Sequence, residues 1–116
     1  MRKLQNHLVG IDQGSVVLFS DFEDGGKMWT GQGPRATKKK IKFSEAYKKV
    51  PAVQVSISMW DTDQNTNQRA DISAEKVTET GFDLVFRTWG DSRVARVRAD
   101  WIAMGELSYS DDWDLY

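Results

Sequence analysis

A tryptophan and several polar side chains meet in one short segment, Trp89-Gly90-Asp91-Ser92-Arg93. The face of an indole packs well against the C–H patch of a pyranose. A guanidinium donates to hydroxyl groups in forked geometry. Arg69 could supply one, because in a β-sandwich it would lie one loop away from Trp89. These residue types are therefore typical of a carbohydrate platform. The alternative is that Trp89 is a turn residue that packs on the end of the fold.

Catalytic and metal chemistry find little support in this sequence. The chain has one histidine, His7, and no cysteine, so a Ser-His-Asp or Cys-His site has no choice of candidates. The segment 61–72 has the alternating oxygen ligands of a calcium loop. However, Thr66 and Ile72 stand where that loop requires glycine and glutamate. We therefore expect no enzymatic activity, no catalytic residue, no cofactor and no metal.

Two extended segments with a period of two flank the Trp89 turn. Their apolar positions are Phe82, Leu84 and Phe86 before it, and Ala95, Val97, Ala99, Trp101 and Ala103 after it. Such alternation predicts strands with one face in a core. Because Gly90 and its polar neighbours suit a tight connection, residues 81–105 are predicted to form a hairpin of two paired strands.

Four more strands are predicted at residues 4–19 (with a bend or bulge at its glycines), 38–43, 52–60 and 69–77. In the third of these, alternation predicts Val53, Val55, Ile57 and Met59 on the core face and Trp60 on the polar face. Trp60 and Trp29 are candidates for the rim of the core. No convincing amphipathic helix is present. About six short strands separated by turn signals favour an antiparallel β-sandwich, with a small barrel as the alternative.

A long loop is predicted between Ser20 and Thr37, because four glycines and a proline crowd into it. Long loops in compact domains often carry function. The most informative residues of this loop are Trp29, Gln32 and Arg35.

Size and charge limit the classes of partner. The chain has 116 residues, which suits one domain, predicted over residues 1–107, followed by an acidic and aromatic tail at 108–116. Its formal net charge of −1 predicts no attraction to nucleic acid or anionic membranes. Lysines alternate with apolar residues in the 38–43 strand, which either protects an exposed strand edge or forms an anion patch.

The sequence shows neither a membrane-spanning helix nor a secretion signal. No window approaches the roughly 18 apolar residues of a membrane helix, so no membrane insertion is expected. The first residues do not resemble a Sec signal peptide. We therefore expect synthesis in the cytoplasm and an extracellular or particle-surface location reached by another route, such as lysis.

Several short motifs follow one another in order between residues 8 and 105. They are Phe43, Pro51-Ala-Val53-Gln-Val55-Ser56-Ile57, Asp61, Arg69, Val77, Gly81-Phe82, Thr88-Trp89 and Trp101-Ile102-Ala103. Together they resemble the H-type lectin family, which comprises the GalNAc-binding domains of snail agglutinins and of the ends of discoidins. The chain resembles a bacterial or phage-like member of that family.

The resemblance implies a six-stranded antiparallel β-sandwich that assembles as a homotrimer, with sugar sites at the subunit interfaces. It implies a carbohydrate site at Gln32, Arg69, Trp89, Gly90 and Asp91. Arg69 and Trp89 match sugar-contacting residues, and Gln32 falls near a key acidic residue of the family. Gly90 stands where the snail lectins have histidine, and Asp91 offers a carboxylate from the other side of the turn. We place Trp29, Arg93, Arg96 and Arg98 near the subunit interface.

The predicted function is therefore non-enzymatic carbohydrate binding, with avidity from a trimer. The expected ligand is a GalNAc- or galactose-type glycan or a bacterial surface polysaccharide, in a setting such as cell adhesion. The alternative is a structural or assembly module of a phage-like particle, for example a decoration or fibre-tip protein, that has the sandwich without the sugar site.

Overall fold

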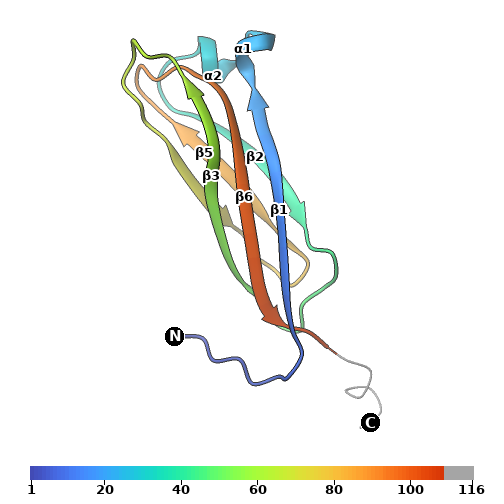
Figure 1. Ribbon diagram of the computed structural model, residues 1–116. Helices are drawn as coiled ribbons and strands as arrows, with labels where there is room; N and C mark the ends of the chain where they lie inside the picture. The colour runs from blue at the N-terminus through green and yellow to red at the C-terminus, as the bar shows by residue number, and fades with distance from the viewer. Residues whose placement is uncertain (109–116) are drawn as a thin grey trace.

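The computed structural model describes residues 1–108, and their strands form a two-layer antiparallel sandwich (Figure 1). One sheet has the order β1-β6-β3 and the other the order β2-β5-β4. The elements are β1 (Val9–Ser20), α1 (Asp21–Asp24), α2 (Lys27–Thr30), β2 (Arg35–Lys42), β3 (Ala52–Thr62), β4 (Asp71–Glu75), β5 (Gly81–Thr88) and β6 (Val94–Glu106). The prediction of a six-stranded antiparallel β-sandwich is confirmed. The predicted tail lies outside the described residues apart from Ser108.

The core lies between the two sheets and is filled from the two central strands, β5 and β6. Their inward residues Leu84, Phe86, Val97 and Ala99 are almost completely buried. Toward one end, the ring of Trp101 lies 5.6 Å from that of Phe82 and 6.0 Å from that of Phe43. Burial of these alternating side chains is what holds the two layers together.

The connection between β5 and β6 differs from the predicted hairpin. β5 pairs with β2 and β4, so that Phe86 faces Thr37 and Ile72 across the ladders, whereas β6 pairs with β1 and β3. Residues 89–93 therefore form an arch that crosses from one sheet to the other. The hairpin prediction is wrong because alternation shows only that each strand has a core face, and it does so equally for paired strands and for strands in facing layers.

A bulge changes the direction of side chains near the end of β3. The pairing of β3 with β6 slips between Ile57 and Met59. After the slip, Met59 lies opposite the exposed Arg98 and Trp60 opposite the buried Val97. An extra residue in one strand shifts all later side chains by one position. Trp60 thus departs from the polar face that alternation predicts and lies at the rim of the sandwich.

The molecule is elongated, with principal extents of 61 × 28 × 19 Å. The helical turns and the loops after β3 and β5 gather at one end, here called the loop end (Figure 1). The N-terminal segment lies at the opposite end (Figure 1), where the Glu106 carboxylate accepts the backbone N–H groups of Gln5 and Asn6 at 2.8 and 2.6 Å. In the described part of the chain, no helix has the length and apolar character needed to cross a membrane.

Candidate functional site

Two buried hydroxyl groups fix the backbone of Arg69 at the loop end. The Ser92 hydroxyl accepts the Arg69 N–H at 2.9 Å and donates to the carbonyl of Asn67 at 2.5 Å. The Thr88 hydroxyl donates to the Arg69 carbonyl at 2.5 Å. Both side chains are 1% exposed. Because buried polar groups are costly when unpaired, these bonds hold the 63–70 loop on the 89–93 arch.

The side chain of Arg69 is held by Asp91. Its Nη1 donates to Oδ1 of Asp91, while Oδ2 of the same carboxylate accepts the Asn67 N–H at 3.2 Å. The Asn67 backbone N–H, and then the Arg69 guanidinium, keep the pKa of Asp91 below its usual value. Within residues 1–108, Nε and Nη2 of Arg69 have no hydrogen-bond partner. The site therefore combines an ionised carboxylate with unused guanidinium donors.

Gly90 makes the close approach of Arg69 possible. Its backbone has φ +68°, in the left-handed region, and a Cβ at this position would lie 3.1 Å from Nη1 of Arg69. Glycine adopts this conformation without a steric penalty. The absence of a side chain at position 90 therefore lets the guanidinium lie directly against the arch.

Trp89 and Gln32 are both close to Gly90, since Trp89 precedes it in the arch and Gln32 precedes Gly33. Trp89 is 43% exposed and borders a hollow of about 280 Å³ together with Pro34. Gln32 is exposed, and its loop is tied to the arch by the Gly33 N–H, which donates to the Gly90 carbonyl at 2.9 Å. The Gln32 side chain makes no hydrogen bond with any residue in 1–108.

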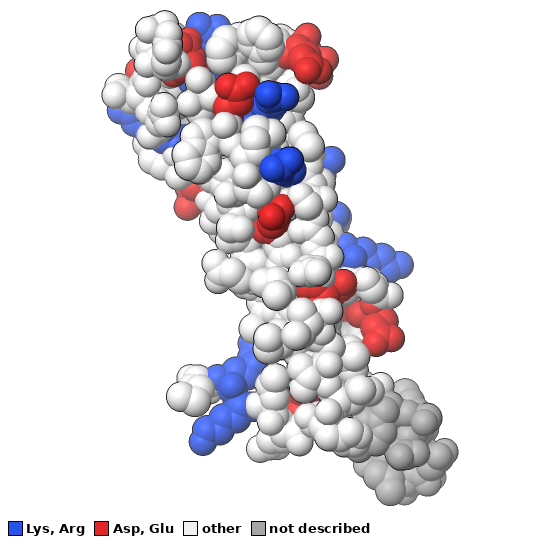
Figure 2. Space-filling model, viewed as in Figure 1, with Lys and Arg blue, Asp and Glu red and all other residues white. Residues whose placement is uncertain are grey.

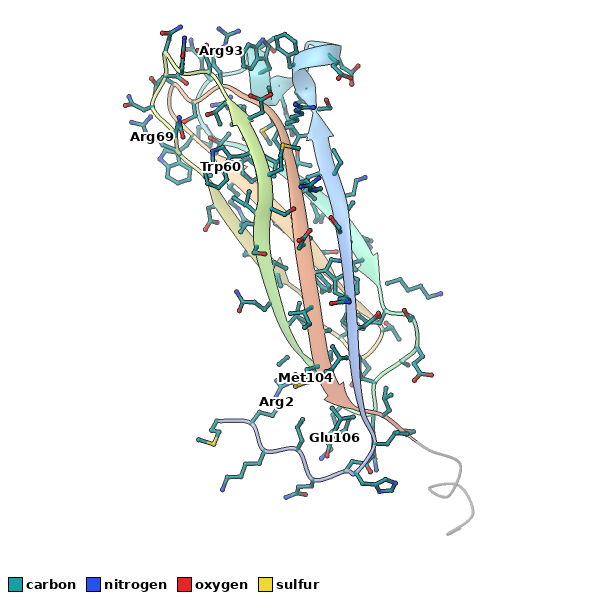
Figure 3. The ribbon with its side chains drawn as sticks, in the orientation of Figure 1. Arg2, Trp60, Arg69, Arg93, Met104 and Glu106 are labelled. Carbon is teal, nitrogen blue, oxygen red and sulfur yellow. The ribbon has the colours of Figure 1, made fainter. Side chains whose placement is uncertain are left out.

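The structure thus brings the predicted site residues to one end of the fold. Arg69, Gly90 and Asp91 are in direct contact, Trp89 is adjacent in the arch, and Gln32 lies in the loop that is tied to Gly90. Figure 3 shows Arg69 and Arg93 at this end, with Trp60 close to Arg69. The roles of the Ser92 and Thr88 hydroxyls cannot be predicted from the sequence, because nothing in a strand pattern shows which loop a hydroxyl will meet.

Arg35 is a second residue whose role the sequence does not show. Its side chain is buried, and it donates to the carbonyls of Gly33 at 2.9 Å, Met28 at 3.2 Å, Lys27 at 3.3 Å and Gly90 at 3.3 Å. This guanidinium joins α2, the Gln32 loop and the arch. Its place in a glycine-rich loop makes it a candidate functional residue, but its burial depends on the docking of that loop.

The residues assigned to a subunit interface have different surroundings. The Arg93 guanidinium lies 4.4 Å from the ring centre of Trp29, and its Nε donates to the Trp29 carbonyl at 2.9 Å. Arg96 and Arg98 are exposed on the outer face of β6, where Arg96 pairs with Asp61 at 3.3 Å. The contact between Arg93 and Trp29 therefore stabilises the loop end within one chain. The placement of all four residues at a subunit interface stays a prediction.

The site offers hydrogen-bond donors, a carboxylate acceptor and an aromatic face on the loops of an antiparallel β-sandwich, which are the features of a sugar-recognition domain. Among residues 1–108, no three His, Asp or Glu side chains gather as a metal site would require. The family model of the H-type lectin domain matches residues 38–104. The chain belongs to the H-type lectin domain family.

Two groups of relatives are similar in sequence. The chain is 55% identical over 107 residues to the protein "ATP synthase subunits region ORF 7" of Fuscovulum blasticum, covering 92% of this chain and 93% of that protein. It is 32% identical over 76 residues to Discoidin-2 of Dictyostelium discoideum, covering 65% of this chain and 30% of that protein. The chain therefore spans less than a third of the length of that discoidin.

Solved structures show the same fold. Discoidin II of Dictyostelium discoideum superposes with a TM-score of 0.74 at 24% identity, over 90% of this chain and 40% of that chain. The tailspike protein gp49 of Pseudomonas phage LKA1 superposes with a TM-score of 0.52 at 17% identity, over 86% of this chain and 15% of that chain. Both are likenesses of fold.

Proposed function

We propose that this protein binds carbohydrate at the loop end and does not change it chemically. The observation that carries the proposal is the Arg69 guanidinium, which Asp91 fixes through one nitrogen while its other two nitrogens have no partner within residues 1–108. The half-exposed Trp89 directly precedes Gly90, against which this guanidinium lies. Membership of a lectin family supports sugar as the class of ligand. The expected glycans are GalNAc- or galactose-type, or a bacterial surface polysaccharide.

Each group has a distinct part in binding. The Trp89 indole packs on the apolar face of a pyranose, and the free nitrogens of Arg69 donate to its hydroxyl groups. Asp91 orients Arg69 and remains ionised because its pKa is lowered. Gln32 offers one carbonyl acceptor and an amide donor, where an aspartate would accept from two hydroxyls.

A glycan array tests the proposal. The array includes bacterial polysaccharides, and binding is competed with millimolar monosaccharides. We expect saturable, competable binding by the native chain and its loss in Trp89→Ala. Absence of binding across the array, or unchanged binding in a folded Trp89→Ala variant, contradicts the proposal.

We further propose that the chain assembles as a homotrimer through the outer face of the β1-β6-β3 sheet. Ile11, Met104 and Ala52 form one row across the three strands of this face. Exposed fractions here are 62% for Ile11, 49% for Val17, 41% for Met104 and 39% for Ile102. Figure 2 shows that this face carries its charges mainly in the upper part and is nearly free of them along the lower half of the sheet. Exposed apolar side chains that gather on one face, with the polar Gln13 and Gln54 beside Ile102, mark a candidate subunit interface.

A structural role in a phage-like particle is the second candidate. It is supported by the placement of the N-terminal segment and the loop end at opposite ends of a molecule 61 Å long. Attachment to a particle through the N-terminal end would present the loop end to the outside, on an extracellular or particle surface. Co-sedimentation of the protein with particles, and its loss from them after residues 1–8 are deleted, tests this role.

A further inference from the structure

A hollow of about 230 Å³ opens beside Arg69, at the edge of the sandwich where β3 faces β4. Its floor is made by the core residues Phe86, Val94 and Val97, and its rim by Trp60, Thr62 and Gln68. It lies below the roughly 300–1,000 Å³ typical of pockets for drug-sized ligands. A hollow of this size and lining suits a single ring with one apolar face.

Trp60 is the unusual residue of this hollow. It is 60% exposed, whereas Trp101 is only 9% exposed. Within residues 1–108, its ring has no aromatic partner and its indole N–H has no acceptor. The bulge at Ile57–Met59 brings Trp60 to this edge. An exposed indole without a partner in residues 1–108 offers both its apolar face and its donor to a ligand.

The polar groups of the rim are available as well. The Gln68 amide and the Thr62 hydroxyl make no hydrogen bond with any residue of the described part of the chain. The amide offers donors and an acceptor, and the hydroxyl offers one of each. A ring that packs on Trp60 would therefore meet groups able to bond its hydroxyls.

Arg69 joins this hollow to the site at the arch. It forms part of the lining of the hollow, while its guanidinium contacts Asp91 and lies against Gly90. Its carbonyl also accepts the hydroxyl of Thr88, the residue before Trp89. Arg69 thus lies between the arch that carries Trp89 and the hollow that is lined by Trp60. Figure 3 shows Arg69 and Trp60 next to each other beside β3.

We propose that this hollow is a second sugar subsite, which binds the pyranose adjacent to the one at Trp89. The ligand class is then an oligosaccharide or polysaccharide, with Arg69 shared between two neighbouring rings. Trp60 packs on the second ring, and Gln68 and Thr62 bond its hydroxyls. This inference rests on the proposed sugar site at Arg69 and Trp89.

Calorimetry with ligands of increasing length tests the subsite. The probes are the methyl glycosides of galactose and N-acetylgalactosamine, and the di- and trisaccharides that end in each. We expect the second ring to tighten binding by the native chain about tenfold, as one aromatic contact allows. Trp60→Ala should lose that gain and bind the monosaccharide as before, while Trp60→Phe should keep part of the gain.

Phe22→Ala is the matched control, since Phe22 is an aromatic residue of α1 with 61% exposure. It should retain the gain from the second ring. Equal affinity of the native chain for one and two rings, or an equal loss for all ligands in Trp60→Ala, would overturn the subsite. A change in the mass of the assembly in Trp60→Ala would also overturn it, because Trp60 would then be a subunit contact. If no sugar binds the native chain, the proposed function fails and the subsite fails with it.

Discussion

Arg69 is held in place by groups from other segments. Its backbone is bonded by the hydroxyls of Ser92 and Thr88, and its guanidinium by Asp91. Each of these partners belongs to β5 or the arch and lies between 19 and 23 residues after Arg69 in the sequence. The orientation of the guanidinium therefore depends on the docking of two loops. Fixing the donor before the ligand arrives lowers the entropy cost of binding.

Gly90→Ala should weaken both stability and sugar binding. The left-handed backbone conformation, φ +68°, costs a residue with a side chain about 1–2 kcal/mol, and the new Cβ would meet the Arg69 guanidinium. Thermal unfolding and calorimetric titration measure the two effects. Gly25→Ala is the control, because Gly25 has φ +65° with nothing within 4 Å of its added Cβ. The control should lose similar stability and keep its sugar affinity; equal affinity in both variants would contradict the role of Gly90.

The strands show how much the sequence reveals. The alternating residues of β5 and β6 predict both strands and their core faces, including Phe86 and Trp101. They do not reveal that β5 and β6 lie in different sheets, nor that the bulge after Ile57 turns Trp60 to the edge. Pairing and bulges are decided by contacts between distant segments, which local alternation does not record.

In the candidate site, too, local features can be predicted from the sequence and contacts between distant segments cannot. The identities of Trp89, Gly90 and Asp91 stand out as a turn with recognition chemistry, and the resemblance to H-type lectins adds Arg69 and Gln32. The burial of Arg35 and Ser92 is seen only in the folded chain, since it depends on which carbonyl groups the loops bring to them. The residues of the proposed site can thus be selected from the sequence by type and resemblance, whereas the buried residues that hold the loops together cannot.

An ion pair between neighbouring strands should make the stability of the fold depend on pH in the acidic range. Arg87 of β5 donates to Glu75 of β4 at 2.6 Å, and this bond, with one from Ser73, lowers the pKa of Glu75 to about 2 from 4.5. Since the folded pKa is depressed, the stabilisation is complete above pH 4.5 and is lost as the pH falls toward 2. In urea unfolding, Glu75→Gln should therefore be less stable than the native chain at pH 6, with the difference shrinking below pH 4.5. A difference that stays constant down to pH 2.5 would contradict this assignment.

At the scale of the whole molecule, the proposed roles fall on separate parts, namely the two ends and one face. The loop end carries the proposed sugar site, and the N-terminal segment lies at the other end (Figure 1). The outer face of β1-β6-β3, which exposes Ile11, Val17 and Met104, runs between them. Packing three such faces together would align the strands and place three sugar sites at one end, where weak sites gain avidity.

Light scattering after size exclusion tests the trimer. The native chain should have three times the 13.2 kDa of a monomer at micromolar concentration. Ile11→Lys places a charge on the apolar face and should give a folded monomer. Ala36→Lys adds the same charge at an exposed position of β2, in the other sheet, and should remain trimeric. A native chain that elutes as a monomer would refute the assembly.

The central claim is that Arg69 and Trp89 together bind a sugar ring. A crystal structure of the protein soaked with galactose, N-acetylgalactosamine and their disaccharides tests it most directly. The predicted result is a pyranose packed on the Trp89 indole, with its hydroxyls bonded to the free nitrogens of Arg69 while Asp91 keeps its contact with Nη1. Sugar bound only at another surface, with water alone at Arg69 and Trp89, would contradict the claim.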